Sequence, residues 1–196
     1  LKEAIGVCGL ITPWNWPLNQ VTVKVFPALA TGCTTVLKPP QLAPYSAQIL
    51  AEIMHKAGTP AGVFNMIQGQ GSEIGSALSK HPDVDMISFT GSEAVGIQIS
   101  KDAADTVKRV GLELGGKSAW IILDDADMAA NVAAATSGMM VNSGQTCSAG
   151  SRLLVPNARM AEAVAAAKAA CEAVTVGNQV QRLILLVIAT LITAMI

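Results

Sequence analysis

The segment Met86-Ile-Ser-Phe-Thr-Gly-Ser-Glu-Ala-Val-Gly96 joins an apolar run to a glycine turn and then to the start of a helical pattern. The run lacks a clean polar alternation, which is typical of a strand covered on both faces. Similar runs recur along the chain, and the other expected strands are Thr34–Lys38, Val63–Ile67, Arg109–Leu114 and Ala119–Leu123. Strands and helices that alternate at this spacing predict right-handed crossovers and a parallel sheet.

Helical patterns lie between and after these strands. They are expected at Pro44–Lys56, Ser72–Ser79, Glu93–Ala104, Asp127–Val141 and Ala158–Val174. The sequence therefore predicts an α/β fold with a doubly wound parallel sheet in residues 1–123. A second lobe is expected to start at residues 124–178, and residues 179–196 form an anomalous apolar tail.

Composition excludes several classes of protein. Of the 196 residues, 51% are hydrophobic and 14% are charged, which excludes a disordered chain. Thirteen Lys and Arg against fourteen Asp and Glu leave a net charge of −1, and a nucleic-acid surface needs clustered basic charge. Four cysteines without a CxxC pair, together with only two histidines, argue against a metal site and favour a reduced, cytoplasmic protein.

The start of the chain offers no secretory signal, since no basic stretch leads into an apolar run. The chain begins with Leu1 rather than Met, which favours an N-terminus that has been cut away.

Two glycine-rich turns follow expected strands, at the edge where parallel sheets bind ligands. They are Gly69-Gln-Gly71-Ser-Glu-Ile-Gly75 and Phe89-Thr-Gly91-Ser92-Glu-Ala-Val95-Gly96. Glycine lets the backbone approach a phosphate, and the N-terminus of the following helix offers free N–H groups. The first turn lacks the GxGxxG spacing, so for that turn a plain tight turn remains an equal alternative.

Four further segments carry chemical groups: Pro13-Trp14-Asn15-Trp16-Pro17, Leu37-Lys38-Pro39-Pro40, Glu113-Leu-Gly115-Gly116-Lys117 and Asn142-Ser-Gly144-Gln145-Thr146-Cys147-Ser148. In order and spacing they resemble the NAD(P)-dependent aldehyde dehydrogenase superfamily, from about Ile5 to Gly177. The resemblance implies that residues 1–123 form a Rossmann-like cofactor-binding lobe and that residues 124–178 start the catalytic lobe.

Without the resemblance, ordinary structural roles compete for the same residues. Cys8, Cys33 and Cys171 lie in apolar or helical patterns and are expected in the core, where free cysteine is often buried. Cys147 differs, because its loop is polar. Glu113 has apolar neighbours, so burial beside a partner remains as open for it as a functional role.

The resemblance assigns the catalytic roles. Cys147 matches the nucleophile, whose thiolate attacks the aldehyde carbon. The Asn15 amide and the Cys147 backbone N–H match the donors that stabilise the resulting oxyanion. Glu113 matches the general base that activates water to hydrolyse the thioester.

The cofactor would be NAD or NADP. The resemblance places Lys38 at an adenosine ribose hydroxyl. The remaining residues that it assigns to the cofactor are Gly91 and Ser92 at the pyrophosphate, and Ile11, Thr12, Trp14, Gly71, Val95 and Leu114 along the groove. Many NAD-preferring members carry Glu where this chain has Gln41, three residues after the lysine. Since a neutral amide does not repel a 2′-phosphate, the choice between NAD and NADP stays open.

Other functions remain as alternatives. A CoA-acylating dehydrogenase would pass the acyl group to CoA, although that transfer does not need a base such as Glu113. A cofactor-binding or interaction module without turnover is the other alternative, because the resemblance covers less than half of a family member. For the isolated chain we expect no steady-state activity.

The expected partners are an aldehyde substrate and, at full length, further copies of the protein. Neither nucleic acid nor a membrane is an expected partner. Gln179–Ile196 departs from the family pattern, and within it Leu183–Ile196 contains only two polar residues. A frameshifted or misassembled end is the preferred explanation, ahead of a buried helix, and the stretch is shorter than the roughly 20 residues that span a membrane.

Overall fold

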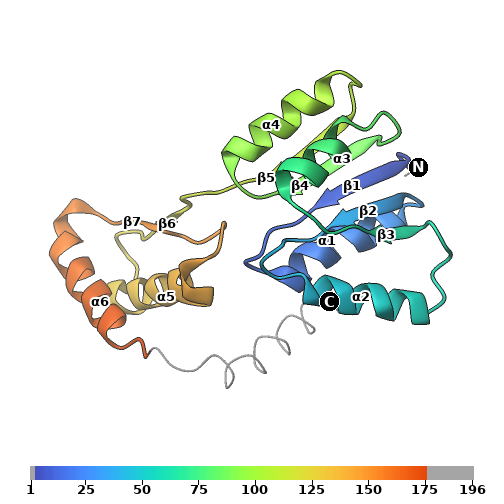
Figure 1. The fold of residues 1–196 in the computed structure, drawn as a ribbon. Coiled ribbons are helices and arrows are strands. Elements are labelled where there is room, and N and C mark those ends of the chain that lie inside the picture. Colours follow the sequence, from blue (N-terminus) through green and yellow to red (C-terminus); the bar gives the residue numbers. More distant parts are fainter. Residues whose placement is uncertain (1–2, 176–196) are drawn as a thin grey trace. The chain divides into compact units, whose positions relative to one another are not determined.

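The computed structural model describes residues 3–175, so the expected tail at 179–196 lies outside the described residues. The first part is a five-stranded sheet of β1 (Val7–Ile11), β2 (Thr34–Lys38), β3 (Phe64–Met66), β4 (Met86–Thr90) and β5 (Arg109–Glu113) (Figure 1). The strand order is β3-β2-β1-β4-β5, and every neighbouring pair is parallel. The predicted doubly wound parallel sheet is confirmed.

Two layers of helices cover this sheet (Figure 1). On one face, α1 (Pro17–Ala30) and α2 (Tyr45–Lys56) bury an apolar cluster with β1 and β2. Val21 and Val25 lie four residues apart in α1, hence on one side of the helix, and both are fully buried. On the other face, α3 (Ser76–Lys80) and α4 (Glu93–Ala104) pack over β1 and β4, and a π-helical turn at Gly71–Gly75 precedes α3.

The sequence prediction missed β1 and α1. Gly9 interrupts the short apolar run of β1, and glycine disfavours strands when judged alone. In the sheet, a Cβ at Gly9 would lie 2.5 Å from Ile87 Cδ1, so the missing side chain makes room for the Ile87 side chain of the neighbouring strand. The helix α1 starts at Pro17 and also contains Pro27, which weakens its local helical signal.

The second compact unit begins at Gly116, immediately after the first ends at Gly115, whereas the sequence analysis placed the boundary between residues 123 and 124. Its strands are β6 (Ala119–Ile121) and β7 (Arg152–Leu154), which pair in parallel. The expected strand Ala119–Leu123 thus exists in shorter form, but it pairs with β7 and does not join the five-stranded sheet.

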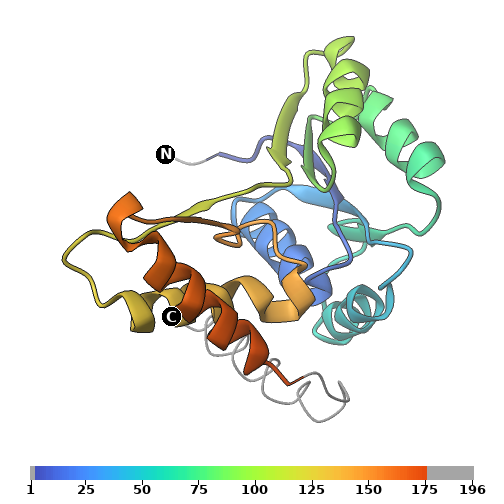
Figure 2. The ribbon, with the colours of Figure 1, turned by 90° about the vertical axis from the view of Figure 1, so that its left-hand side faces the viewer.

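Helices α5 (Met128–Met140) and α6 (Met160–Glu172) lie side by side in this unit (Figures 1 and 2). Short 3-10 turns at Val141–Gly144 and Asn157–Arg159 precede β7 and α6, respectively. The buried core consists of Ile122, Met128, Val132 and Ala163. Between residues 3 and 175, no helix combines the length and the apolar character needed to cross a membrane.

Candidate functional site

The carboxyl ends of the five strands share one edge of the first unit because all five are parallel. Lys38 ends β2, Thr90 ends β4, and Gly69 follows β3 by three residues, so these three residues share this edge, as a parallel sheet requires. The chain winds outward through β1, β2 and β3 and then places β4 on the other side of β1. This reversal is the point at which doubly wound sheets bind ligands.

Lys38 is a buried cation at this edge. It is 5% exposed, and its Nζ donates to the Pro39 carbonyl at 3.2 Å. Burial lowers the pKa of the Lys38 ammonium. The Lys38 ammonium has three N–H donors, and the Pro39 carbonyl accepts from it, so donors remain for a polar ligand. Gln41, three residues further on, is exposed.

The two glycine turns differ in what surrounds them. A Cβ at Gly71 would meet no atom within 4 Å, so the backbone there faces open space. A Cβ at Gly91 would lie 2.4 Å from the Phe89 ring, and the Gly91 N–H donates to the Glu113 carbonyl at 3.0 Å. The second turn is therefore packed against its own strand and tied to β5.

The remaining predicted groove residues lie near the same edge or on the helix that follows it. Ser92 is the N-cap of α4, and Val95 is exposed in its first turn. A Cβ at Gly96 would lie 2.8 Å from Leu114 Cδ2, which shows how closely α4 approaches the chain after β5. Ile11 and Thr12 are buried at the end of β1.

The loop between β1 and α1 carries the predicted amide. Asn15 is half-buried in it, and Trp14 beside it is 45% exposed. The first unit therefore contains Asn15, Lys38, Glu113 and both glycine turns, whereas Cys147 belongs to the second unit.

Glu113 is exposed at the end of β5, so the alternative that it is buried beside a partner is wrong. Lys24 of α1, which the sequence analysis missed, donates from Nζ to Ser88 Oγ at 2.8 Å. Burial lowers the pKa of the Lys24 ammonium, and the negative charge of Glu113 opposes that shift. A lone lysine between apolar residues of α1 is the sequence signal that could have drawn attention to Lys24.

Cys147 is half-buried in the second unit. Asn142 and Ser143, in the 3-10 turn before it, have positive φ angles of 54° and 58°. A Cβ at Gly116 would lie 2.9 Å from the Cys147 carbonyl oxygen, so glycine there lets the two backbones approach. The predicted core position is confirmed for Cys8 and Cys33, which are buried, but it is wrong for Cys171, because this residue lies in the last turn of α6, where the chain from Cys171 to Thr175 is exposed.

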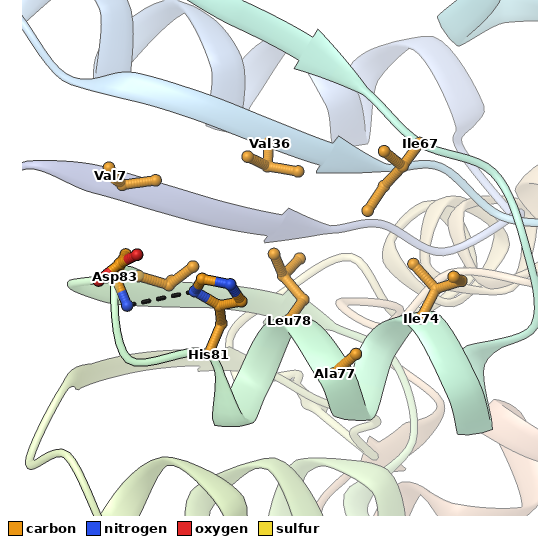
Figure 3. A pocket seen from close by; sticks show the side chains of 9 residues that line it. Val7, Val36, Ile67, Ile74, Ala77, Leu78, His81 and Asp83 are labelled. Carbon is orange, nitrogen blue, oxygen red and sulfur yellow. Dashed lines mark hydrogen bonds between the residues drawn. The ribbon is translucent and has the colours of Figure 1, made fainter.

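A separate cavity of about 410 Å³ lies between α3 and the sheet (Figure 3). Its walls are mostly apolar, with residues such as Val7, Val36, Ile74 and Leu78. At one end the Asp83 N–H donates to His81 Nδ1 at 3.2 Å. None of the predicted cofactor residues lines this cavity, which offers few donors to a nucleotide. Within residues 3–175, no cluster of His, Cys, Asp or Glu could hold a metal ion.

Comparison with known proteins gives the family. A profile of the aldehyde dehydrogenase family matches residues 1–192. The chain belongs to this family. It is 54% identical over 178 residues to a 3-succinoylsemialdehyde-pyridine dehydrogenase from a Pseudomonas species, a match that covers 91% of this chain and 37% of that relative. The chain thus spans little more than a third of the length of this family relative.

Solved structures of proteins with similar sequences agree in fold. A mutant of aldehyde dehydrogenase C from Pseudomonas syringae, in complex with NAD+ and octanal, is 52% identical with a TM-score of 0.88. That match covers 89% of this chain and 36% of the other. An NADP-dependent enzyme from E. coli is 41% identical with a TM-score of 0.86, over 90% of this chain and 37% of the other.

Proposed function

We propose that this chain carries the cofactor-binding part and the nucleophile of an enzyme that oxidises an aldehyde to a carboxylic acid with NAD+ or NADP+. The observation that carries the proposal is the carboxyl edge of the sheet, where a buried lysine and two glycine turns flank the switch point. The family membership supports the reaction class.

The residues at this edge fit a dinucleotide. Lys38 has donors free for ribose hydroxyls. Gly71 leaves its backbone open, and Gly91 and Ser92 precede the N-terminus of α4, which favours phosphate. Two buried threonine hydroxyls, of Thr12 and Thr90, have no partner within the described residues, as expected of a site that a polar ligand completes. The groove would further involve Ile11, Trp14, Val95 and Leu114.

The chemistry would start at Cys147, whose thiolate adds to the aldehyde carbon. The Asn15 amide and the Cys147 N–H would stabilise the oxyanion of this adduct, and such donors are typically worth about 3 kcal/mol each. NAD(P)+, when bound, supplies the hydride acceptor. Loss of hydride from the adduct leaves a thioester on Cys147.

Glu113 would then take a proton from the water that hydrolyses this thioester. Its exposed carboxylate at the end of β5 supports the role, since water can reach it. A base that activates water favours hydrolysis over transfer of the acyl group to CoA.

Binding measurements test the part of the proposal that concerns the cofactor. Calorimetric titration of the 196-residue chain should detect NAD+ or NADP+, and Lys38→Ala should weaken binding about tenfold through the loss of hydrogen bonds from a charged group. Gln41→Glu should shift preference toward NAD+, since a carboxylate there accepts from both ribose hydroxyls and repels a 2′-phosphate. An unchanged ratio of the two dissociation constants would show that Gln41 is not at this ribose.

Kinetics tests the catalytic part, in a full-length enzyme that contains this chain. Cys147→Ser should abolish turnover. Glu113→Gln should still release one equivalent of NAD(P)H in a burst and then stall at the thioester. Asn15→Ala should slow the burst itself, because the oxyanion forms before hydride leaves. A Glu113→Gln enzyme without a burst would move Glu113 to an earlier step.

The proposal extends to the setting of the enzyme. We propose an aldehyde as its substrate, a homo-oligomer as its assembly and the cytoplasm as its location. The substrate class follows from the family, and the four unpaired cysteines suit a reducing compartment.

A further inference from the structure

The cavity between α3 and the sheet is a feature that the proposed function does not use. It lies entirely within the first unit, and none of the residues proposed for the cofactor or for the reacting aldehyde lines it. β1 and β2 form one side, and α3 with the π-helical turn before it forms the other (Figure 3). Its volume of about 410 Å³ is within the range of about 300–1,000 Å³ that is typical of small-molecule sites.

The walls of this cavity are apolar and in contact with water. Seven of its nine lining residues are apolar, and side chains from opposite sides, such as Ile67 and Ile74, point toward one another (Figure 3). Val7, Val36 and Ile74 stay only half-buried. An apolar molecule that covers such a concave surface removes it from water and gains free energy by doing so. Apolar cavities therefore favour small apolar ligands over water.

One end of the cavity is polar and selects among such ligands. The Asp83 N–H donates to His81 Nδ1, so in the neutral imidazole the other ring nitrogen, Nε2, carries the proton and can donate. Asp83 carries the only permanent charge among the residues that line the cavity, and that charge is negative. This end therefore fits a hydrogen-bond acceptor without charge and disfavours an anion, which would lose its hydration beside a carboxylate.

Ile74 connects the cavity to the first glycine turn. Its side chain lines the cavity, and a Cβ at Gly69 would lie only 2.6 Å from Ile74 Cγ1. Ile74 lies in the π-helical turn Gly71–Gly75, and such turns are frequent at functional sites. A molecule that packs against Ile74 in the cavity therefore pushes on a side chain that also contacts the turn.

We propose that this cavity binds a neutral, mostly apolar molecule with one hydrogen-bond acceptor, such as a short alcohol or ketone, and that the bound molecule shifts the Gly69–Gly75 turn through Ile74. The proposal goes beyond the proposed function and does not depend on it, since no residue assigned to the reaction lines the cavity.

The test is an NMR titration of the 196-residue chain with 1-hexanol and with hexanoate, which have the same chain length and differ in charge. 1-Hexanol should bind with a dissociation constant of about 1 mM, as expected for seven non-hydrogen atoms in an apolar site. It should shift the amide signals of Gly69–Gly75, whereas the amides of α1 and α2, on the other face of the sheet, should not move. Hexanoate should bind about fivefold more weakly or less.

A variant that fills the cavity ties this binding to its place. Ala77 is exposed in α3 and points into the cavity (Figure 3), so Ala77→Phe should weaken 1-hexanol binding about tenfold or more. Ala77→Leu adds less volume and keeps a strong helix former, and it should weaken binding about threefold even if the Phe variant misfolds. The matched control is Ala104→Phe, at an exposed alanine that ends α4 outside the cavity.

Four results would overturn this proposal and leave the cofactor role untouched. 1-Hexanol binding by the two Ala77 variants as tight as by Ala104→Phe would place the alcohol elsewhere. Hexanoate binding as tight as 1-hexanol would refute the selection for a neutral ligand. Binding without any shift at Gly69–Gly75 would refute the contact through Ile74. A full-length enzyme that contains this chain and does not bind 1-hexanol in the cavity would show that another segment of the enzyme fills it.

Discussion

Asp102 joins the two helices that follow the glycine turns, and its removal should loosen both. It is 8% exposed in α4, and its Oδ2 accepts a hydrogen bond from Ser76 Oγ of α3 at 3.0 Å. Its Oδ1 accepts from Gln98 Nε2 at 2.8 Å and lies 3.7 Å from Lys80 Nζ, also of α3. A buried carboxylate is tolerated only when it is paired in this way.

The contributions of these Asp102 contacts to the free energy of unfolding can be ranked from the exposure and charge of the partners. A hydrogen bond to an ionised group contributes about 1.5–3 kcal/mol, which applies to the contact from Ser76. The Lys80 side chain is 60% exposed, so this ion pair contributes at most about 0.5 kcal/mol after screening by solvent. We therefore expect Asp102→Ala to lower the free energy of unfolding by about 2–3 kcal/mol, Ser76→Ala by about 1–2 kcal/mol and Lys80→Ala by less than about 0.5 kcal/mol.

Urea unfolding, combined with hydrogen exchange of the α3 and α4 amides, measures these changes in the first unit. A double-mutant cycle of Ser76→Ala and Asp102→Ala should give a coupling of about 1 kcal/mol or more. Asp105→Ala, at an exposed aspartate just after the same helix, is the matched control and should have little effect. An Asp102→Ala chain as stable as the Asp105→Ala chain would refute the assignment of Asp102 as the link between the two helices.

Three further predictions concern the glycine beside the nucleophile loop and the buried thiol. Gly116→Ala places a Cβ 2.9 Å from the Cys147 carbonyl oxygen, so it should cost about 1–2 kcal/mol and change the alkylation rate of Cys147, whereas Gly115→Ala, with open space around it, should not. Mass spectrometry after alkylation at pH 8 should find exposed Cys171 labelled and Cys8 unlabelled in the folded chain. Burial, reinforced by the neighbouring Cys33 thiol, raises the pKa of Cys8 from near 9 to about 12, so this thiol ionises first in the unfolded chain. Urea unfolding should therefore show a free energy of unfolding that keeps the Cys8 contribution below pH 9 and loses it as the pH rises toward 12. In Cys8→Ala this pH-dependent part of the free energy of unfolding should be absent.

Local sequence patterns were sufficient to predict the bounds of a helix or strand where the pattern is compatible with only one kind of secondary structure. The observed bounds of β2, β4 and α4 are those expected from the sequence, because turn residues flank an apolar run or an amphipathic stretch at each of them. The placement of Lys38 and Thr90 at one edge followed from the prediction of a parallel sheet, since parallel strands all end on the same side.

The strands that the sequence prediction missed or assigned to the wrong sheet have a common physical cause. β1 looks weak as a sequence, yet it is the central strand, and Gly9 leaves room there for the Ile87 side chain of β4. Ala119–Leu123 looks like another strand of the first sheet, but the residues that pair with it lie more than thirty positions later, in β7. Periodicity within a segment carries no information about its partner.

Sequence patterns alone predicted the class of fold, the edge at which the sheet offers a ligand site, and the residues that match the family motifs. Folding added four features: the strands that flank the switch point, the exposure of Glu113, the contact between Lys24 and Ser88, and the unpaired hydroxyls of Thr12 and Thr90. These features depend on tertiary contacts because burial and hydrogen bonding are set by neighbours in space. Those neighbours come from strands and helices that lie far apart along the chain.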